Sequence, residues 1–172
     1  MKFGIISGIV LTAYLLVVYS LSIHYLTDAN ISYWFPTLGI HPIAMFLALK
    51  EADRITGGGS FRERVRAPFL TFTVANVFFW LTLYALHLYD PQLNQLELSL
   101  QLQNAQQQLS AGMGDPQVMN QLRQDINSIQ AELANPRPQP MGPYVLYLAL
   151  WNVFGFGLAA LTITIFKPTL QK

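Results

Sequence analysis

Four long apolar stretches divide the chain, and each is long enough to cross a membrane as a helix. They cover residues 3–26, 33–49, 68–89 and 143–166. About 20 apolar residues, rising about 1.5 Å each along a helix, span the roughly 30 Å hydrocarbon core of a bilayer. The pattern therefore predicts an all-α membrane protein with four transmembrane helices, ending in a short tail that reaches residue 172.

Prolines mark the ends of these stretches. Pro68 and Pro143 stand where the third and fourth helices are expected to begin, in the first turn, where a missing amide hydrogen costs nothing. The second stretch is short and carries Pro36, Gly39 and Pro42 in its first half. We therefore expect this span to be the least regular of the four.

Residues 91–135 have a different pattern, with leucines at helical spacing among many glutamines. Two Asp-Pro pairs, at 90–91 and 115–116, supply an N-cap and a first helical residue, and residues 110–114 supply a turn between them. The pattern predicts an antiparallel helical hairpin between the third and fourth spans. Its apolar stripes comprise Leu93, Leu96 and Leu100 in the first helix and Val118, Leu122, Ile126 and Ile129 in the second.

The stripe of the first hairpin helix is wider than one partner helix can cover, because Leu98, Leu102 and Leu109 broaden it. Either the hairpin stands alone with some leucine exposed, or its surplus apolar face docks on another subunit. We favour docking, since a glutamine-rich surface with few charges suits a contact. A proline-rich linker, residues 136–142, returns the chain to the membrane.

The cations indicate the orientation. The N-terminus, the loop over residues 50–67 and the C-terminal tail carry eight of them, and the opposite side carries only Arg123 and Arg137. Cytoplasmic segments are the ones enriched in Lys and Arg. Both termini are therefore expected in the cytoplasm and the hairpin outside it, and we expect a bacterial inner membrane or a thylakoid membrane.

The 50–67 loop contains a glycine run, Gly57–Gly59, followed by alternating arginines. The run lacks the Lys-Ser/Thr ending and the preceding strand of a phosphate-binding loop, so we expect no nucleotide. Arg62, Arg64 and Arg66 are expected to mark the cytoplasmic side and to contact anionic lipid head groups.

Composition narrows the function classes further. Hydrophobic residues make up 52% of the chain and charged residues 11%, which is typical of a membrane protein. The net charge of +1 provides no field that would hold nucleic acid. Cysteine is absent, so disulfides, thiolate metal sites and thiol catalysis are excluded.

Three histidines are the main candidates for chemistry within the membrane, where ionisable groups are costly. His24 and His87 are expected at matched depth near the outer interface, where two imidazoles could hold one haem iron, and His41 lies deeper. A single histidine could instead ligate the magnesium of a chlorophyll. We expect no cofactor, and for His41 a hydrogen bond to a carbonyl freed by Pro42.

The remaining polar and small residues within the spans favour helix packing. Asn76 and Asn152 are expected to hydrogen-bond each other across a helix interface. Two pairs of small residues, Gly4 with Gly8 and Gly155 with Ala159, suit close contact within the chain or with a neighbouring subunit.

These features together suggest a non-catalytic accessory or assembly subunit of a larger membrane complex, photosynthetic or respiratory. Its partners would be the bilayer and other membrane subunits or further copies of itself. Two alternatives stay open, a small haem- or pigment-binding subunit that uses His24 and His87 and, more weakly, a transporter or channel component.

Overall fold

The computed structural model describes residues 2–111, 116–136 and 139–166, and nearly all of them are helical. Four helical segments are long and apolar enough to cross a membrane: Lys2–Leu21, Asn30–Thr56, Phe61–Tyr89 and Gly142–Ile165. No strand occurs within the described ranges. The expected turn at residues 112–114, the Asp115 cap and the cations Arg137, Lys167 and Lys172 lie outside them.

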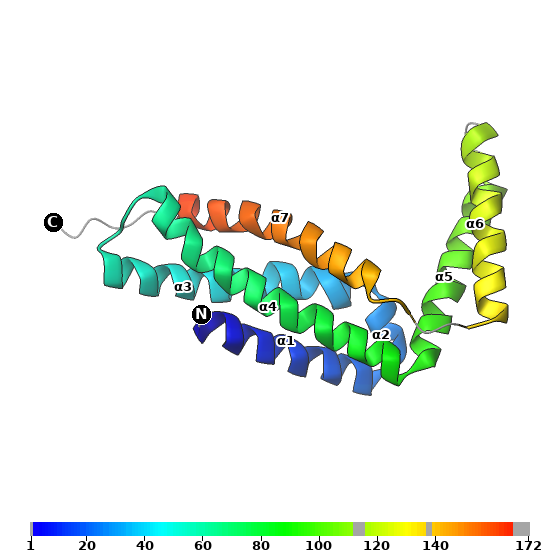
Figure 1. Ribbon diagram of the computed structural model, residues 1–172, viewed down its shortest axis with the longest axis horizontal. Helices are drawn as coiled ribbons and strands as arrows, with labels where there is room; N and C mark the ends of the chain where they lie inside the picture. Colours follow the sequence, from blue (N-terminus) through cyan, green and yellow to red (C-terminus); the bar gives the residue numbers. More distant parts are fainter. Residues whose placement is uncertain (1, 112–115, 137–138, 167–172) are drawn as a thin grey trace. The chain divides into compact units, whose positions relative to one another are not determined.

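The chain divides into two compact units. One, the bundle unit, combines residues up to Tyr84 with residues from Met141 onward. The other, the amide-rich unit, comprises Ala85–Pro140. In the bundle unit α1 (Lys2–Leu21), α3 (His41–Thr56), α4 (Phe61–Tyr89) and α7 (Gly142–Ile165) run side by side (Figure 1).

The first span ends earlier than its apolar run. A break at Ser22 separates α1 from the short α2 (Ile23–Thr27), because Ser22 is extended and its hydroxyl accepts a hydrogen bond from the His24 amide. Two further bonds hold the reversal into the second span. The Tyr14 hydroxyl donates to the Ile31 carbonyl at 2.7 Å, and the buried Ser32 hydroxyl donates to the Leu26 carbonyl at 2.6 Å.

The second span is irregular where its prolines and glycine predicted irregularity. Two π-helical segments, η1 (Asn30–Trp34) and η2 (Pro36–Ile40), precede α3. The His41 amide closes the second wide turn by donating to the Pro36 carbonyl. A wider turn relieves the contact between a proline ring and the preceding carbonyl, so the span continues through Pro36 without a sharp kink.

The expectation of a long loop over residues 50–67 was wrong. Helix α3 continues to Thr56 and α4 begins at Phe61, so only residues 57–60 connect them. Pro68 consequently lies inside α4, not in its first turn. The glycine run forms a tight turn, in which Gly57 and Gly58 have φ values of 70° and 82° that favour glycine.

The core of the bundle unit lies where α3, α4 and α7 meet. Phe72 of α4 is fully buried, and so are Met45 of α3 and Ala159 of α7. Leu49, Val65 and Ile163 complete this buried cluster. Because Val65 belongs to it, the first turns of α4 contribute to the core and not to a loop.

The amide-rich unit contains α5 (Pro91–Ser110) and α6 (Pro116–Ala134), which pack against each other. The Asp90 side chain caps α5 by accepting a hydrogen bond from the Gln92 amide at 2.9 Å, as the Asp-Pro pair predicted. The Gln139 side chain donates to the Asn94 side chain within the same unit.

Candidate functional site

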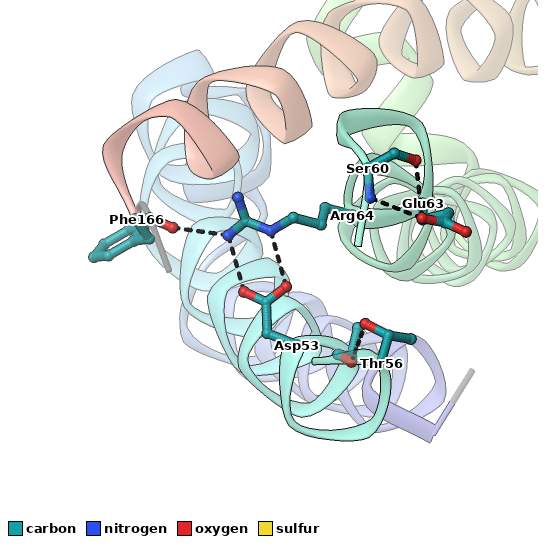
Figure 2. Close-up of polar contacts among 7 residues, drawn as sticks. Asp53, Thr56, Ser60, Glu63, Arg64 and Phe166 are labelled. Carbon is teal, nitrogen blue, oxygen red and sulfur yellow. Dashed lines mark hydrogen bonds and ion pairs between the residues drawn. The ribbon is translucent and has the colours of Figure 1, made fainter. Parts of the chain in front are cut away.

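One end of the bundle unit holds a buried ion pair that joins three helices. The Arg64 guanidinium donates from Nε and Nη2 to the two carboxylate oxygens of Asp53, at 2.8 and 2.9 Å (Figure 2). Nη2 also donates to the Phe166 carbonyl at 2.9 Å. Asp53 lies in α3, Arg64 in α4 and Phe166 directly after α7, so this Arg64 junction fixes all three helix ends.

The turn at residues 57–60, which precedes α4, positions Arg64 through hydrogen bonds to Ser60. Glu63 accepts hydrogen bonds from the Ser60 amide and hydroxyl at 2.7 and 2.9 Å, which starts α4 with a capping interaction (Figure 2). The Arg64 amide then donates to the Ser60 carbonyl at 3.0 Å. This capping explains why α4 begins well before Pro68.

The three arginines expected at lipid head groups therefore differ. Arg62 and Arg66 are exposed, whereas the Arg64 side chain is only 8% exposed and is directed at Asp53. The expectation of head-group contact does not fit Arg64, because its side chain is buried and its Nε and Nη2 bond Asp53 and Phe166 within the protein. It stays a prediction for Arg62 and Arg66.

Small residues allow α4 to approach its neighbours closely. A side chain at Gly4 would meet Val74, and one at Gly8 would lie 2.6 Å from the Phe78 ring. A side chain at Gly155 would overlap the Phe72 ring, and Ala159 is fully buried. Both small-residue pairs thus make contacts within this chain.

Polar atoms are buried in the interior of the same unit. His41 and Asn76 are each 3% exposed, and the His41 ring lies 4.5 Å from the Phe72 ring. His41 Nδ1, Asn76 Nδ2, Trp80 Nε1 and Asn152 Oδ1 are buried without a hydrogen-bond partner. The expected bond from His41 to a carbonyl freed by Pro42 is therefore not made at Nδ1.

Asn76 and Asn152 occupy the same level of the interface between α4 and α7. The two helices are antiparallel, since Trp80 stacks on Tyr147 at 5.4 Å and Tyr84 meets Tyr144 at 5.1 Å, while Phe72 lies against Gly155. The expected bond between the asparagines is nevertheless absent. Asn152 Nδ2 donates instead to the Leu148 carbonyl of its own helix at 2.8 Å, a local bond that competes with a partner on another helix.

The histidines expected to hold haem lie in different surroundings. His24 is exposed on α2 in the bundle unit, whereas His87 belongs to the amide-rich unit. The His87 side chain is 2% exposed, and its Nε2 lies 3.1 Å from Glu97 Oε1. Glu97 Oε1 thus lies directly beside the nitrogen that a haem iron would need.

The leucine stripes of α5 and α6 are covered only in part. Leu93, Leu98 and Ile126 are buried, while Leu96, Leu100, Leu122 and Ile129 are partly exposed. Among the described residues of these helices, Val118 is the one large apolar side chain that is exposed. Part of each stripe is therefore covered within the chain, and docking of the remaining apolar surface on another subunit stays a prediction.

Sequence reasoning missed Asp53 and Trp80. Asp53 was one of several charges in an expected loop, and no spacing rule pairs it with an arginine eleven positions later across a turn. In the sequence Trp80 is one apolar residue among many in a span. A buried indole usually requires a hydrogen-bond acceptor, and this requirement was the signal that could have identified Trp80 as a candidate site residue.

The bundle unit thus has an interior with buried polar atoms that make no hydrogen bond, and one end that carries the Arg64 junction. Among the described residues, no three His, Asp or Glu side chains come together as a metal site. The interior histidine, asparagines and tryptophan are hydrogen-bonding groups, and the charged end carries side chains of both signs.

The chain was compared with known families, curated proteins and solved structures. Residues 2–167 match the model of DUF4199, a family of proteins of unknown function. Neither a curated protein nor a solved structure matches the chain. Because the match covers all of the spans and the helices between them, the chain belongs to the DUF4199 family.

Proposed function

We propose that this DUF4199 protein is a non-catalytic accessory or assembly subunit of a larger membrane complex. It acts through a helix face in the bilayer and through the α5–α6 pair outside the cytoplasm. The positive-inside bias supports this orientation, with both termini cytoplasmic. A bacterial inner membrane or a thylakoid membrane is the proposed location.

The observation that carries the proposal is the exposed face of α7. Four large side chains at helical spacing form it, with Gly157 in their midst, and they are 54–75% exposed: Leu146, Leu150, Val153 and Leu161. A side chain at Gly157 would meet nothing within 4 Å. Glycine weakens a helix and brings no benefit toward lipid, but it lets the backbone of another helix approach closely. This face therefore suits a helix of another subunit.

The α5–α6 pair supports the same function by a different chemistry. Its outward surface is rich in exposed glutamines, among them Gln95, Gln103 and Gln121. Neutral amides donate and accept hydrogen bonds and cost less to remove from water than charges. The proposed contact is therefore largely polar, with Val118 and the partly exposed leucines of the stripes as its apolar contribution.

Two variants test the proposal in the native membrane. In one, a short Gly-Ser linker replaces residues 92–134, and in the other Gly157→Leu fills the α7 face. Each should lose proteins that co-purify with the wild-type chain in mild detergent, while the chain stays membrane-inserted. Val145→Leu, at an exposed apolar position of α7 outside this face, is the control. An unchanged set of co-purifying proteins in both variants would overturn the proposal.

We do not extend the proposal to haem or to transport. The engagement of His87 by Glu97 speaks against a ready haem ligand. The polar interior residues make no continuous series of hydrogen bonds in the described structure that would favour a substrate path.

A further inference from the structure

We infer that the charged end of the bundle unit holds one zwitterionic phospholipid, with a phosphate and a primary ammonium in its head group. The site is a pocket of about 560 Å³ between α1, α3 and α4. This volume falls in the range of pockets that bind small molecules and accommodates a head group with the first part of an acyl chain.

Small side chains create the pocket. Ala48 and Ala52 lie one turn apart on α3, and Ala67 faces the same space from α4. Larger side chains at these positions would fill the gap between the helices. Phe3 and Leu70 complete the apolar wall, which is the surface that an acyl chain would contact.

Charges of both signs surround the opening. Lys2 and Arg66 supply two cations, and Glu51 and Glu63 supply two carboxylates. Ile55, an apolar residue that is 72% exposed, lines the pocket together with these charged residues. A rim that combines paired opposite charges with exposed apolar surface matches a ligand that is itself zwitterionic and amphiphilic.

The rim charges remain able to bind a ligand. Lys2 bonds one Glu51 oxygen at 2.8 Å and Arg54 lies 3.1 Å from the other, but the two cationic side chains are 63% and 75% exposed, and such surface pairs contribute little and exchange readily. Glu63 accepts both of its bonds from Ser60 on Oε2, and its other oxygen points away from Ser60 (Figure 2). Oε1 therefore keeps its capacity to accept hydrogen bonds.

These positions distinguish between head groups. Lys2 and Arg66 would bind the phosphate, and the carboxylates would accept hydrogen bonds from the ammonium. A primary ammonium donates such bonds, whereas the quaternary ammonium of phosphatidylcholine has no hydrogen to donate. The inferred ligand is therefore phosphatidylethanolamine, preferred over phosphatidylcholine and over phosphatidylglycerol, which has no ammonium.

The depth of the pocket fits this ligand. Lys2 begins the first candidate span, and Arg66 lies near the start of the third. Charged residues that flank apolar spans lie at the level of the lipid head groups, and long cationic side chains extend toward that level.

The test uses the full-length protein reconstituted in bilayers with equal amounts of phosphatidylethanolamine, phosphatidylcholine and phosphatidylglycerol. Native mass spectrometry after mild release then measures the lipid that each protein retains. We expect one retained phosphatidylethanolamine, about tenfold over phosphatidylcholine, which corresponds to about one charge-assisted hydrogen bond. Equal retention of the three lipids would overturn the inference.

Three variants separate the parts of the site. Ala52→Leu should abolish retention of any lipid, Arg66→Gln should lower retention about tenfold, and Glu63→Gln should remove the preference over phosphatidylcholine. Lys50→Gln is the matched control, because Lys50 is an exposed cation on α3 that does not line the pocket. All variants are compared at equal helicity and elution volume. Arg66→Gln and Ala52→Leu proteins that retain as much phosphatidylethanolamine as Lys50→Gln would overturn the inference.

Discussion

Arg64 and Asp53 form a two-point ion pair across the α3–α4 turn, with both donor-to-acceptor distances below 3 Å. The same guanidinium bonds the Phe166 carbonyl at the end of α7. One side chain thereby connects helices that are far apart in the sequence. Since the Arg64 side chain is buried, its charge depends on Asp53 for compensation.

Breaking this pair should destabilise the bundle unit. We expect Arg64→Gln and Asp53→Asn each to lower the free energy of unfolding by about 3 kcal/mol, because each leaves a partly buried charge without its partner. Thermal unfolding in mild detergent measures the effect as a lower midpoint. Arg62→Gln, an exposed arginine two positions away, should leave the midpoint unchanged. Equal midpoints for the Arg64 and Arg62 variants would contradict the role of the junction.

Replacing Arg64 by lysine tests the geometry and not only the charge. Lysine keeps the cation but cannot bond both Asp53 oxygens and the Phe166 carbonyl in one plane. We expect Arg64→Lys to recover less than half of the stability lost in Arg64→Gln. Full recovery in the same thermal measurement would show that charge alone matters at this position.

Two glycines in α7 provide a matched pair for the packing of α7 on α4. Gly155→Ala should lower the free energy of unfolding by about 2 kcal/mol, within the usual cost of overpacking, because the added methyl group would overlap the Phe72 ring. Gly157→Ala meets nothing and should be neutral or should stabilise the helix by about 0.5–1 kcal/mol. Phe72→Leu combined with Gly155→Ala should recover part of the loss. Equal effects of the two alanine variants would contradict the close contact.

The sequence predicted the helical spans well and their ends poorly. An apolar run can be recognised from the sequence without knowing any tertiary contact, so its length was enough to predict the four spans. Pro36, Gly39 and Pro42 likewise indicated which span is irregular. The ends depend on specific contacts. Glu63 caps α4 at Ser60, and residues that composition assigns to a loop become helical as a result.

The candidate site was predictable where it depends on spacing. Gly4 and Gly8 were identified from their separation along one helix face, and the structure places them against α4. Arg64 was not distinguished from Arg62 and Arg66, because counting charges near a membrane treats all arginines alike. Only the position of Asp53 on the facing helix makes Arg64 different, and that position depends on the length of the turn.

A double-mutant cycle tests the separation of the two asparagines. If Asn76 and Asn152 do not bond each other, the effects of Asn76→Ala and Asn152→Ala on the free energy of unfolding should add, with a coupling near zero. A hydrogen bond between helices in a membrane would give a coupling of about 0.6 kcal/mol. Chemical unfolding in mixed detergent micelles measures all four proteins, and a coupling of that size would show that the asparagines meet across the interface.

The pairing of His87 with Glu97 leads to a prediction about haem. Because Glu97 engages Nε2 of a nearly fully buried His87 side chain, we expect protein purified from haem-supplied cells to carry no stoichiometric haem. The absorption spectrum measures this directly through the Soret band. Glu97→Gln keeps a hydrogen-bonding group of the same size beside the imidazole, whereas Glu97→Ala removes that group, so the two variants show what the Glu97 contact contributes. A Soret band in the wild-type protein that disappears in both His24→Ala and His87→Ala would contradict the prediction, since it would require both imidazoles to reach one iron.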